Sequence, residues 1–150
     1  MPDGCLICDS EKHALARACP RCKKILDRIE TRKAADGTAR RISKEARLRA
    51  LQESWRDGAF HCHYTDVRLV TDPQRWRDHR DHRYLTFEHQ KPGDEESVVV
   101  ACALVNRMKT DLSDRQFRAF VTELAKTFAG GAFDERVFPE GKQPLPGEAP

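Results

Sequence analysis

The stretch of residues 84–109 contains side chains that suit the hydrolysis of a phosphodiester. Glu88 and His89 follow a short β-rich run, and Asn106 lies further along the same stretch. A divalent cation held by Glu88 and Asn106 would polarise a phosphate, while neutral His89 would take a proton from water. Each group alone is more often an ordinary polar residue, and the combination predicts a metal-dependent phosphodiesterase site.

The order of elements in this stretch would bring these side chains together. Residues 84–87 are typical of a strand, residues 91–94 of a turn, and residues 97–100 of a returning β-branched strand. The chain continues without a breaker into residues 101–108, whose composition suits a buried helix with one polar residue, Asn106. A helix packed across the hairpin would offer the Asn106 oxygen at the end of the first strand.

This order and these residues resemble the ββα-metal motif of HNH endonucleases. The resemblance implies that Glu88 is the acidic metal ligand, His89 the general base and Asn106 the last metal ligand. Ser97 matches an asparagine of the turn, and Lys109 matches a lysine that follows the last ligand. The resemblance therefore implies that Ser97 orients the imidazole and that Lys109, or its neighbour Arg107, contacts the phosphate.

The resemblance covers residues 60–128 and implies an α+β fold with a ββα-metal core and flanking helices. It also implies cleavage of DNA that leaves a 5′ phosphate. Glu88 is a methylene longer than the usual aspartate, Ser97 holds an imidazole less firmly than asparagine, and Asn106 is neutral. A neutral oxygen ligand suits Mg²⁺ or Mn²⁺ better than Zn²⁺. The alternative is a nucleic-acid-binding protein whose degenerate hairpin no longer cleaves.

Four cysteines near the N-terminus have the spacing of a structural zinc site. Cys5 and Cys8 form one CxxC pair, and Cys19 and Cys22 form a second pair after ten intervening residues. Two such pairs surround one tetrahedral Zn²⁺ with thiolates and leave no open position for catalysis. Two disulfides or a redox CxxC are the alternatives, but an export signal and a βαβ setting are both lacking. His13, between the pairs, is expected at the surface.

Cys62 and Cys102 are the other two cysteines. The residues that follow Cys62 resemble a family opening in which CxxC pairs bind a further structural zinc. Here the partner position of each pair holds another residue type, so we expect Cys62 and Cys102 to be buried thiols. A second zinc site formed by these two cysteines with His61 and His63 remains an alternative.

Charge is distributed unevenly along the chain. The formal net charge is +3, but residues 12–56 carry +9 and the other residues carry −6. A solvated helix face is one explanation of the basic segment, and a surface that contacts phosphate groups is the other. We expect nucleic acid as the partner, with double-stranded DNA as the expected form. The pattern does not indicate an oligomeric state.

The composition argues against a membrane protein. The mean hydropathy is −0.73, and no apolar run approaches the roughly 18 to 20 residues of a membrane span. The first ten residues also lack an apolar signal region. We therefore expect a cytoplasmic protein with no membrane partner.

The remaining pattern predicts further helices. Helical spacing is expected at residues 21–33 and 44–57, the second with Ser43 as its N-cap and Trp55 as a core anchor. Ser113 and Gln116 predict a capping box at the start of a third helix. Its apolar stripe is expected to pack against the metal-site helix and the strands and to form the core. The stripe consists of Phe117, Phe120, Val121, Leu124, Ala125 and Phe128.

The connecting segments set the expected domain boundaries. Residues 34–41 are typical of a flexible turn, residues 60–70 of a strand, turn and strand, and residues 72–83 of a surface loop or a nucleic-acid contact. The expected organisation has four parts, listed in order: a zinc-binding module with a basic helix at 1–40, a connecting helix at 41–59, an HNH-like nuclease domain at 60–130, and an extended or disordered tail at 131–150.

Overall fold

The computed structural model describes residues 5, 7, 8, 19–27, 31–33, 39–91, 94 and 96–137. The chain divides into two compact units, Met1–Thr110 and Asp111–Pro150. Helices and small antiparallel sheets occur together, so the predicted α+β class is confirmed. The four-part organisation expected from the sequence stays a prediction.

A two-stranded hairpin lies at the centre of the first unit. β5 (Leu85–His89) pairs with β6 (Val98–Cys102) in an antiparallel register that runs from Leu85 opposite Cys102 to His89 opposite Val98. β6 leads directly into α4 (Ala103–Lys109). The predicted order of strand, returning strand and helix is therefore confirmed, with slightly shifted bounds. Residues 92, 93 and 95 of the predicted turn lie outside the described residues.

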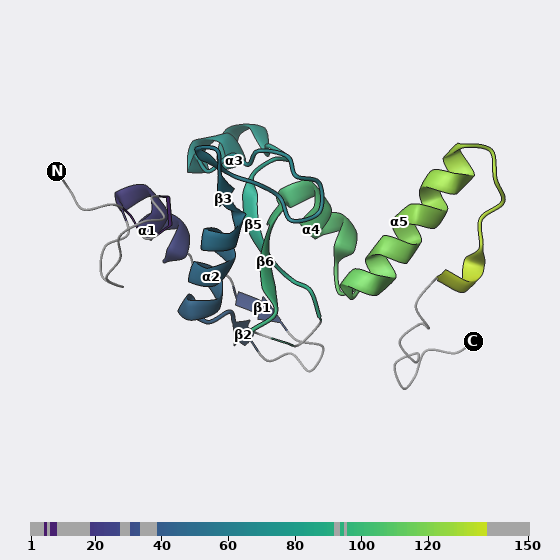
Figure 1. Cartoon of the computed structure of the whole chain (residues 1–150), viewed down its shortest axis with the longest axis horizontal. Helices are drawn as coiled ribbons and strands as arrows, with labels where there is room; N and C mark the ends of the chain where they lie inside the picture. The colour runs from purple at the N-terminus through teal and green to yellow at the C-terminus, as the bar shows by residue number, and fades with distance from the viewer. Residues whose placement is uncertain are drawn as a thin grey trace. The chain divides into compact units, whose positions relative to one another are not determined.

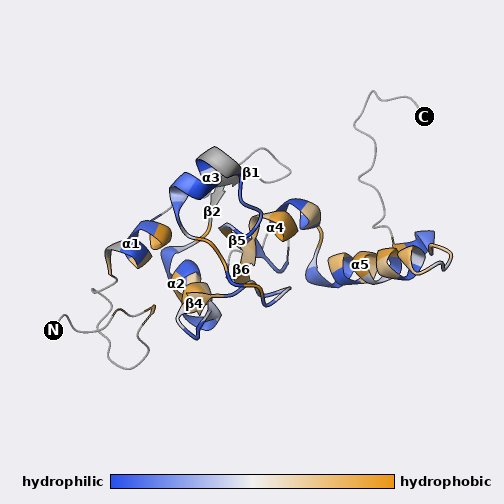
Figure 2. Cartoon of the chain, turned by 90° about the horizontal axis from the view of Figure 1, so that it is seen from above, coloured by the Kyte–Doolittle hydropathy of each residue, from blue (hydrophilic) through white to orange (hydrophobic). Residues whose placement is uncertain are grey.

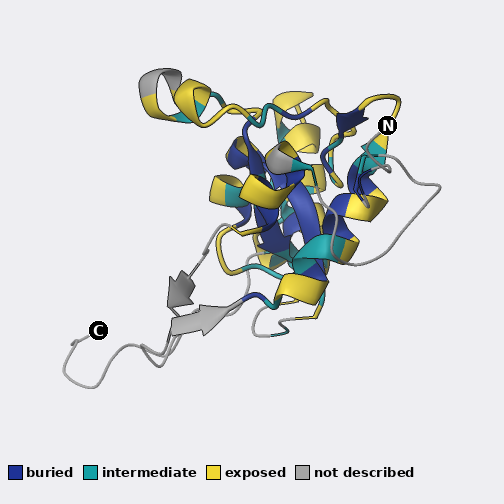
Figure 3. Cartoon of the chain, turned by 90° about the vertical axis from the view of Figure 1, so that its left-hand side faces the viewer, coloured by how far each residue is buried: buried dark blue, intermediate teal, exposed yellow. Residues whose placement is uncertain are grey.

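The core of this unit is built on the hairpin. α2 (Lys44–Ser54) and α4 lie on opposite sides of the β5–β6 pair (Figure 1). Every residue of β6 is buried, as are Leu51 of α2 and Phe87 of β5. Figure 3 shows buried segments gathered toward the middle of this unit. Burial of an aromatic side chain such as Phe87 contributes roughly 2 to 3 kcal/mol to stability. This packing therefore stabilises the hairpin.

The region before α2 differs from the prediction. α1 (Pro20–Leu26) ends well before residue 33, and β1 (Thr31–Lys33) pairs antiparallel with β2 (Ala39–Arg41). The helix expected through residue 33 and the flexible turn expected through residue 41 are therefore wrong at these strands. Both strands are polar, so their backbone pairing leaves no hydrophobic pattern in the sequence. Residues 34–38 lie outside the described residues.

α2 begins as predicted but ends earlier. The Ser43 hydroxyl accepts the Ala46 N–H at 3.1 Å, which confirms the N-cap. β3 (Trp55–Arg56) then pairs with β4 (Ala59–Phe60), so Trp55 is not helical. Asp57 and Gly58 connect these strands with φ of +49° and +75°. An Asp-Gly pair favours a hairpin turn at such angles, which explains why the helical spacing of Trp55 misled the prediction.

The segment after β4 contains an unexpected helix. The strand, turn and strand expected at residues 60–70 reduce to isolated bridges of His61 with Arg68 and of Val70 with Tyr84. α3 (Pro73–His79) occupies the predicted surface loop. The Asp72 side chain caps it by accepting the Gln74 N–H at 2.9 Å, and proline is its first residue. Both features are ordinary helix-start signals.

The second unit contains α5 (Asp114–Phe128) and a short 3₁₀ helix, η1 (Glu135–Val137). Ser113 and Gln116 form the predicted capping box. Figure 2 shows apolar and polar residues along α5. Of its apolar stripe only Phe117 is buried, whereas Phe128 is 82% exposed. The expectation that this stripe forms the core stays a prediction, and the buried core of the first unit lies on the hairpin. Residues 138–150 of the predicted tail lie outside the described residues.

Candidate active site and candidate metal centre

The candidate active site lies where β5 ends. Glu88 and His89 are the last two residues of this strand, opposite Val99 and Val98 of β6. The Glu88 side chain is 1% exposed, and its Oε1 accepts the backbone N–H of His89 at 3.1 Å. His89 is half-buried. The strand therefore presents a buried carboxylate beside a more accessible imidazole.

α4 brings two further side chains to the same place. Asn106 Nδ2 donates to the backbone carbonyl of Phe87 at 3.4 Å. Lys109 Nζ donates to the carbonyl of His89 at 2.5 Å and lies 3.6 Å from Glu88 Oε1. Residues three apart share one face of a helix, so both side chains reach the strand together. The structure thus brings the side chains of Glu88, Asn106 and Lys109 to the end of β5, where His89 contributes its backbone N–H and carbonyl.

Lys109 and Glu88 form a buried ion pair. Each side chain is 1% exposed. Isolated burial of either charge would be costly, so the two groups depend on each other and on the His89 carbonyl. The Lys109 ammonium is directed at the strand, whereas the resemblance predicts contact with a phosphate. We therefore regard Lys109 as a residue that positions Glu88 and the strand end.

Arg107, the other residue expected to reach a phosphate, lies on an exposed part of α4. Its guanidinium carbon is 4.8 Å from the centroid of the Trp76 ring, and Trp76 stacks on Tyr84 with centroids 5.4 Å apart. A guanidinium over an indole face is held by a cation–π interaction. α3 and α4 are thereby linked beside the candidate site.

Ser97 contacts the residue after His89. Its hydroxyl donates to Gln90 Oε1 at 3.4 Å, and Gln90 Nε2 lies 3.3 Å from His63 Nε2. The expected role of Ser97 in orienting His89 stays a prediction. No local sequence signal indicates the contact of Gln90 with His63, because it joins residues 27 positions apart.

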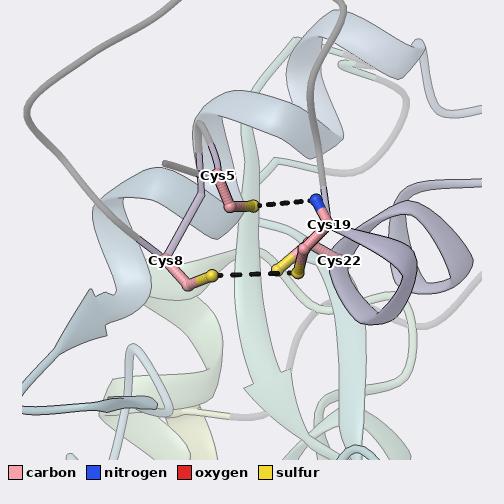
Figure 4. Close-up of side chains that lie close together, drawn as sticks. All are labelled: Cys5, Cys8, Cys19 and Cys22. Carbon is pink, nitrogen blue, oxygen red and sulfur yellow. Dashed lines mark hydrogen bonds between the residues drawn. The ribbon is translucent and has the colours of Figure 1, made fainter. Parts of the chain in front are cut away.

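The candidate metal centre is formed by the four N-terminal cysteines. Cys19 precedes α1 and Cys22 lies within it, and both face Cys5 and Cys8 (Figure 4). The four sulfur atoms all lie within 4.8 Å of one another. Cys19 N–H donates to Cys5 Sγ at 3.2 Å, and the sulfurs of Cys8 and Cys19 are 3.9 Å apart. This confirms the predicted cluster, which could hold a metal such as zinc.

The protonation of the cluster is uneven. For Cys5, burial is the largest single influence on the pKa, and it favours the neutral thiol. The backbone N–H groups, led by that of Cys19, together outweigh burial and lower the pKa of Cys5 to about 6. Burial raises the pKa of Cys8 to about 12, and burial with sulfur hydrogen bonds raises the pKa of Cys22. A cation that binds all four sulfurs must therefore displace protons.

Arg21, the neighbour of Cys22, joins the cysteine cluster to the rest of the first unit. Its guanidinium carbon lies 5.8 Å from the centroid of the Trp55 ring and 5.7 Å from that of Phe60. Its Nε also donates to Thr71 Oγ1 at 3.2 Å. The helix that begins after Cys19 and contains Cys22 is thus anchored on the β3–β4 strand pair.

The alternative second zinc site does not form in the structure. In the part of the chain that the structure describes, the four N-terminal cysteines are the one group of three or more His, Cys, Asp or Glu residues close enough to hold a metal. Cys62 and Cys102 are buried thiols, as expected. His61 and His63 do not complete a ligand set with them.

Comparisons with known proteins do not assign a family. No family model matches the chain, and no match was found among curated proteins or solved structures. The resemblance to HNH endonucleases therefore depends on the residues themselves and on their arrangement. Among the described helices, none combines the length and the hydrophobicity that crossing a bilayer requires.

Proposed function

We propose that the chain is a metal-dependent endonuclease that hydrolyses phosphodiester bonds of DNA. The observation that supports this function best is the position of Asn106, whose amide nitrogen binds the carbonyl of Phe87, next to Glu88. Asn106 therefore lies beside the strand that carries the Glu88 carboxylate and, one residue further on, the His89 imidazole. This is the set of groups that the hydrolysis of a phosphodiester needs.

The donor atoms fit a hard divalent cation. Glu88 and Asn106 offer a carboxylate and an amide oxygen, which are ligands that Mg²⁺ and Mn²⁺ accept. When bound there, such a cation would stabilise negative charge on the phosphate. Glu88 Oε1 accepts the His89 N–H and lies 3.6 Å from Lys109 Nζ, and these contacts hold the carboxylate in one orientation. The Asn106 nitrogen is held by Phe87, which orients the amide, and we assign Oδ1 to the cation.

His89 takes part in the reaction itself, and Lys109 positions the groups around it. His89 takes the proton of the attacking water, as a general base at the accessible end of the strand. Lys109 fixes the Glu88 carboxylate and the His89 carbonyl at once, so these adjacent residues keep one orientation. Such positioning matters because a misplacement of about 1 Å costs roughly 10²-fold in rate.

A plasmid assay tests the proposed activity. The wild-type chain is expected to nick supercoiled plasmid in Mg²⁺ or Mn²⁺ and to leave it intact in EDTA. Asn106→Ala should lower the rate at least about tenfold, because one of the two assigned ligands is lost. Leu104→Ala is the matched control, since Leu104 is 44% exposed on the same helix. Intact plasmid in every metal with the wild-type chain would overturn the proposal.

The burial of Glu88 favours one alternative. A carboxylate that is 1% exposed and paired with Lys109 is also what a degenerate hairpin would contain. The chain would then bind nucleic acid without cleaving it. Some of the basic segment is neutralised, since Lys23 and Lys44 pair with Asp27. DNA affinity that falls steeply with salt, without cleavage in any metal, would favour this alternative.

We also propose that the cysteine cluster holds one structural Zn²⁺. The purified chain is expected to contain about one zinc per molecule by elemental analysis. Cys22→Ser should lose this zinc and destabilise α1, because a seven-residue helix is too short to be stable on its own. Cys102→Ser, which alters a cysteine outside the cluster, should keep it. Full zinc content in the Cys22 variant would contradict the assignment.

A further inference from the structure

Cys62 and Cys102 form a second pair of sulfurs, separate from the metal centre. Cys62 follows β4 and Cys102 ends β6, and their side chains are 2% and 6% exposed. The Cys102 N–H donates to Cys62 Sγ at 3.4 Å. His63 N–H donates to the Val100 carbonyl at 2.9 Å, which fixes this segment against β6. The backbone therefore holds the Cys62 sulfur against residue 102.

The two sulfurs differ in their protonation. The hydrogen bond from the Cys102 thiol, helped by the Thr65 hydroxyl and by backbone N–H groups, lowers the pKa of Cys62 to about 4. The same hydrogen bond raises the pKa of Cys102. At neutral pH the pair is thus one thiolate beside one thiol. The thiolate is the nucleophilic form of cysteine, so Cys62 is the reactive member.

A cavity gives small molecules a place beside Cys62. Its volume is about 130 Å³, and Cys62, His61, His63 and Arg56 are among the residues that line it. His61 Nδ1 is buried and makes no hydrogen bond within the described structure. A polar atom of this kind needs a partner, and the space is large enough for a water-sized guest. The cavity therefore suits a small polar molecule that can hydrogen-bond to His61.

We propose that Cys62 and Cys102 form a peroxide-reactive dithiol, in which the cavity admits the peroxide, Cys62 is oxidised first and Cys102 resolves it. Neither the metal centre nor the proposed nuclease reaction uses these two cysteines. The oxidant is hydrogen peroxide or another small hydroperoxide. The product is a disulfide between the segment after β4 and the end of β6.

The chemistry balances in two steps. The Cys62 thiolate attacks one peroxide oxygen, the S–O bond forms, the O–O bond breaks, and the departing hydroxide takes a proton to become water. The Cys102 thiol then loses its proton, and its sulfur attacks the Cys62 sulfur. The S–S bond forms as the S–O bond breaks, which releases a second water. Two electrons pass from the sulfurs to the peroxide oxygens.

The test is peptide mapping of the full-length, zinc-loaded chain after hydrogen peroxide is added without reductant. The remaining thiols are alkylated with N-ethylmaleimide, and mass spectrometry assigns each cysteine separately. We expect a cross-linked pair of peptides that contain Cys62 and Cys102, and we expect a reductant to reverse it. Oxidation of Cys62 should be about tenfold faster than that of free cysteine in the same buffer.

Two variants separate the roles of the cysteines. Cys102→Ser should accumulate a sulfenic acid that dimedone traps on Cys62. Cys62→Ser should leave the Cys102 thiol open to alkylation. Two alkylated thiols after peroxide treatment of the wild type would overturn the proposal, as would oxidation of Cys102 alone. A second zinc per chain that is lost in Cys62→Ser would also overturn it, because the pair would then be a metal site.

Discussion

Replacement of His89 by alanine is expected to lower the rate of plasmid cleavage by about 10²- to 10⁴-fold, which is the usual contribution of a general base. The imidazole is removed, but the Lys109 ammonium binds the backbone carbonyl of His89, which alanine retains. Glu88 and Asn106 keep their contacts as well. The variant therefore tests the imidazole and leaves the rest of the site in place.

The measurement is the initial nicking rate in saturating Mn²⁺. His82→Ala is the control, because His82 is an exposed histidine that precedes β5. It should cleave at the wild-type rate, and both variants should unfold at the wild-type urea midpoint. Wild-type cleavage by the His89 variant would rule out this residue as the base, even if the protein remained a nuclease.

Lys109→Met is expected to destabilise the first unit by about 3 to 5 kcal/mol, because it leaves the Glu88 carboxylate buried without its cation. The two side chains are each 1% exposed, so water cannot replace the lost partner. The measurement is urea unfolding followed by circular dichroism. Methionine keeps most of the volume of the lysine, so the loss reflects the charge more than a cavity.

A double-mutant cycle isolates this pair. Glu88→Gln combined with Lys109→Met should be less destabilised than Lys109→Met alone, because the double variant has no orphaned charge. Lys126→Met is the exposed control, since Lys126 pairs with Glu123 at 56% side-chain exposure. That change should cost less than about 1 kcal/mol. Equal losses of unfolding free energy in Lys109→Met and Lys126→Met would show that the ion pair of Lys109 with Glu88 does not stabilise the strand.

Local signals predicted the hairpin and the helix that follows it. The β-branched run before Cys102 predicts a strand, and the turn residues ahead of that run predict a turn. Asn106 then falls on the helix that follows. The contact of Lys109 with Glu88 was not predictable in the same way. It depends on how α4 packs across β5, and the sequence led us to expect a phosphate contact instead.

The errors elsewhere have related causes. Trp55 fits a helical spacing, but the Asp57-Gly58 turn overrides it with positive φ angles. α3 carries its start signals in Asp72 and Pro73, which the charge pattern of the following residues obscured. The capping box of Ser113 is local and was predicted correctly, whereas the burial of the α5 stripe depends on a packing partner.

The two tryptophans of the chain lie beneath arginines from different sites. Arg21, beside Cys22, covers Trp55, and Arg107, beside Asn106, covers Trp76. An indole changes its emission when a charge over its ring moves, so the two fluorophores respond to separate events. Filling of the sulfur cluster would alter the signal of Trp55, and a cation at the proposed site of Glu88 and Asn106 would alter that of Trp76. The untagged protein thus contains its own optical means of telling the two proposed binding events apart.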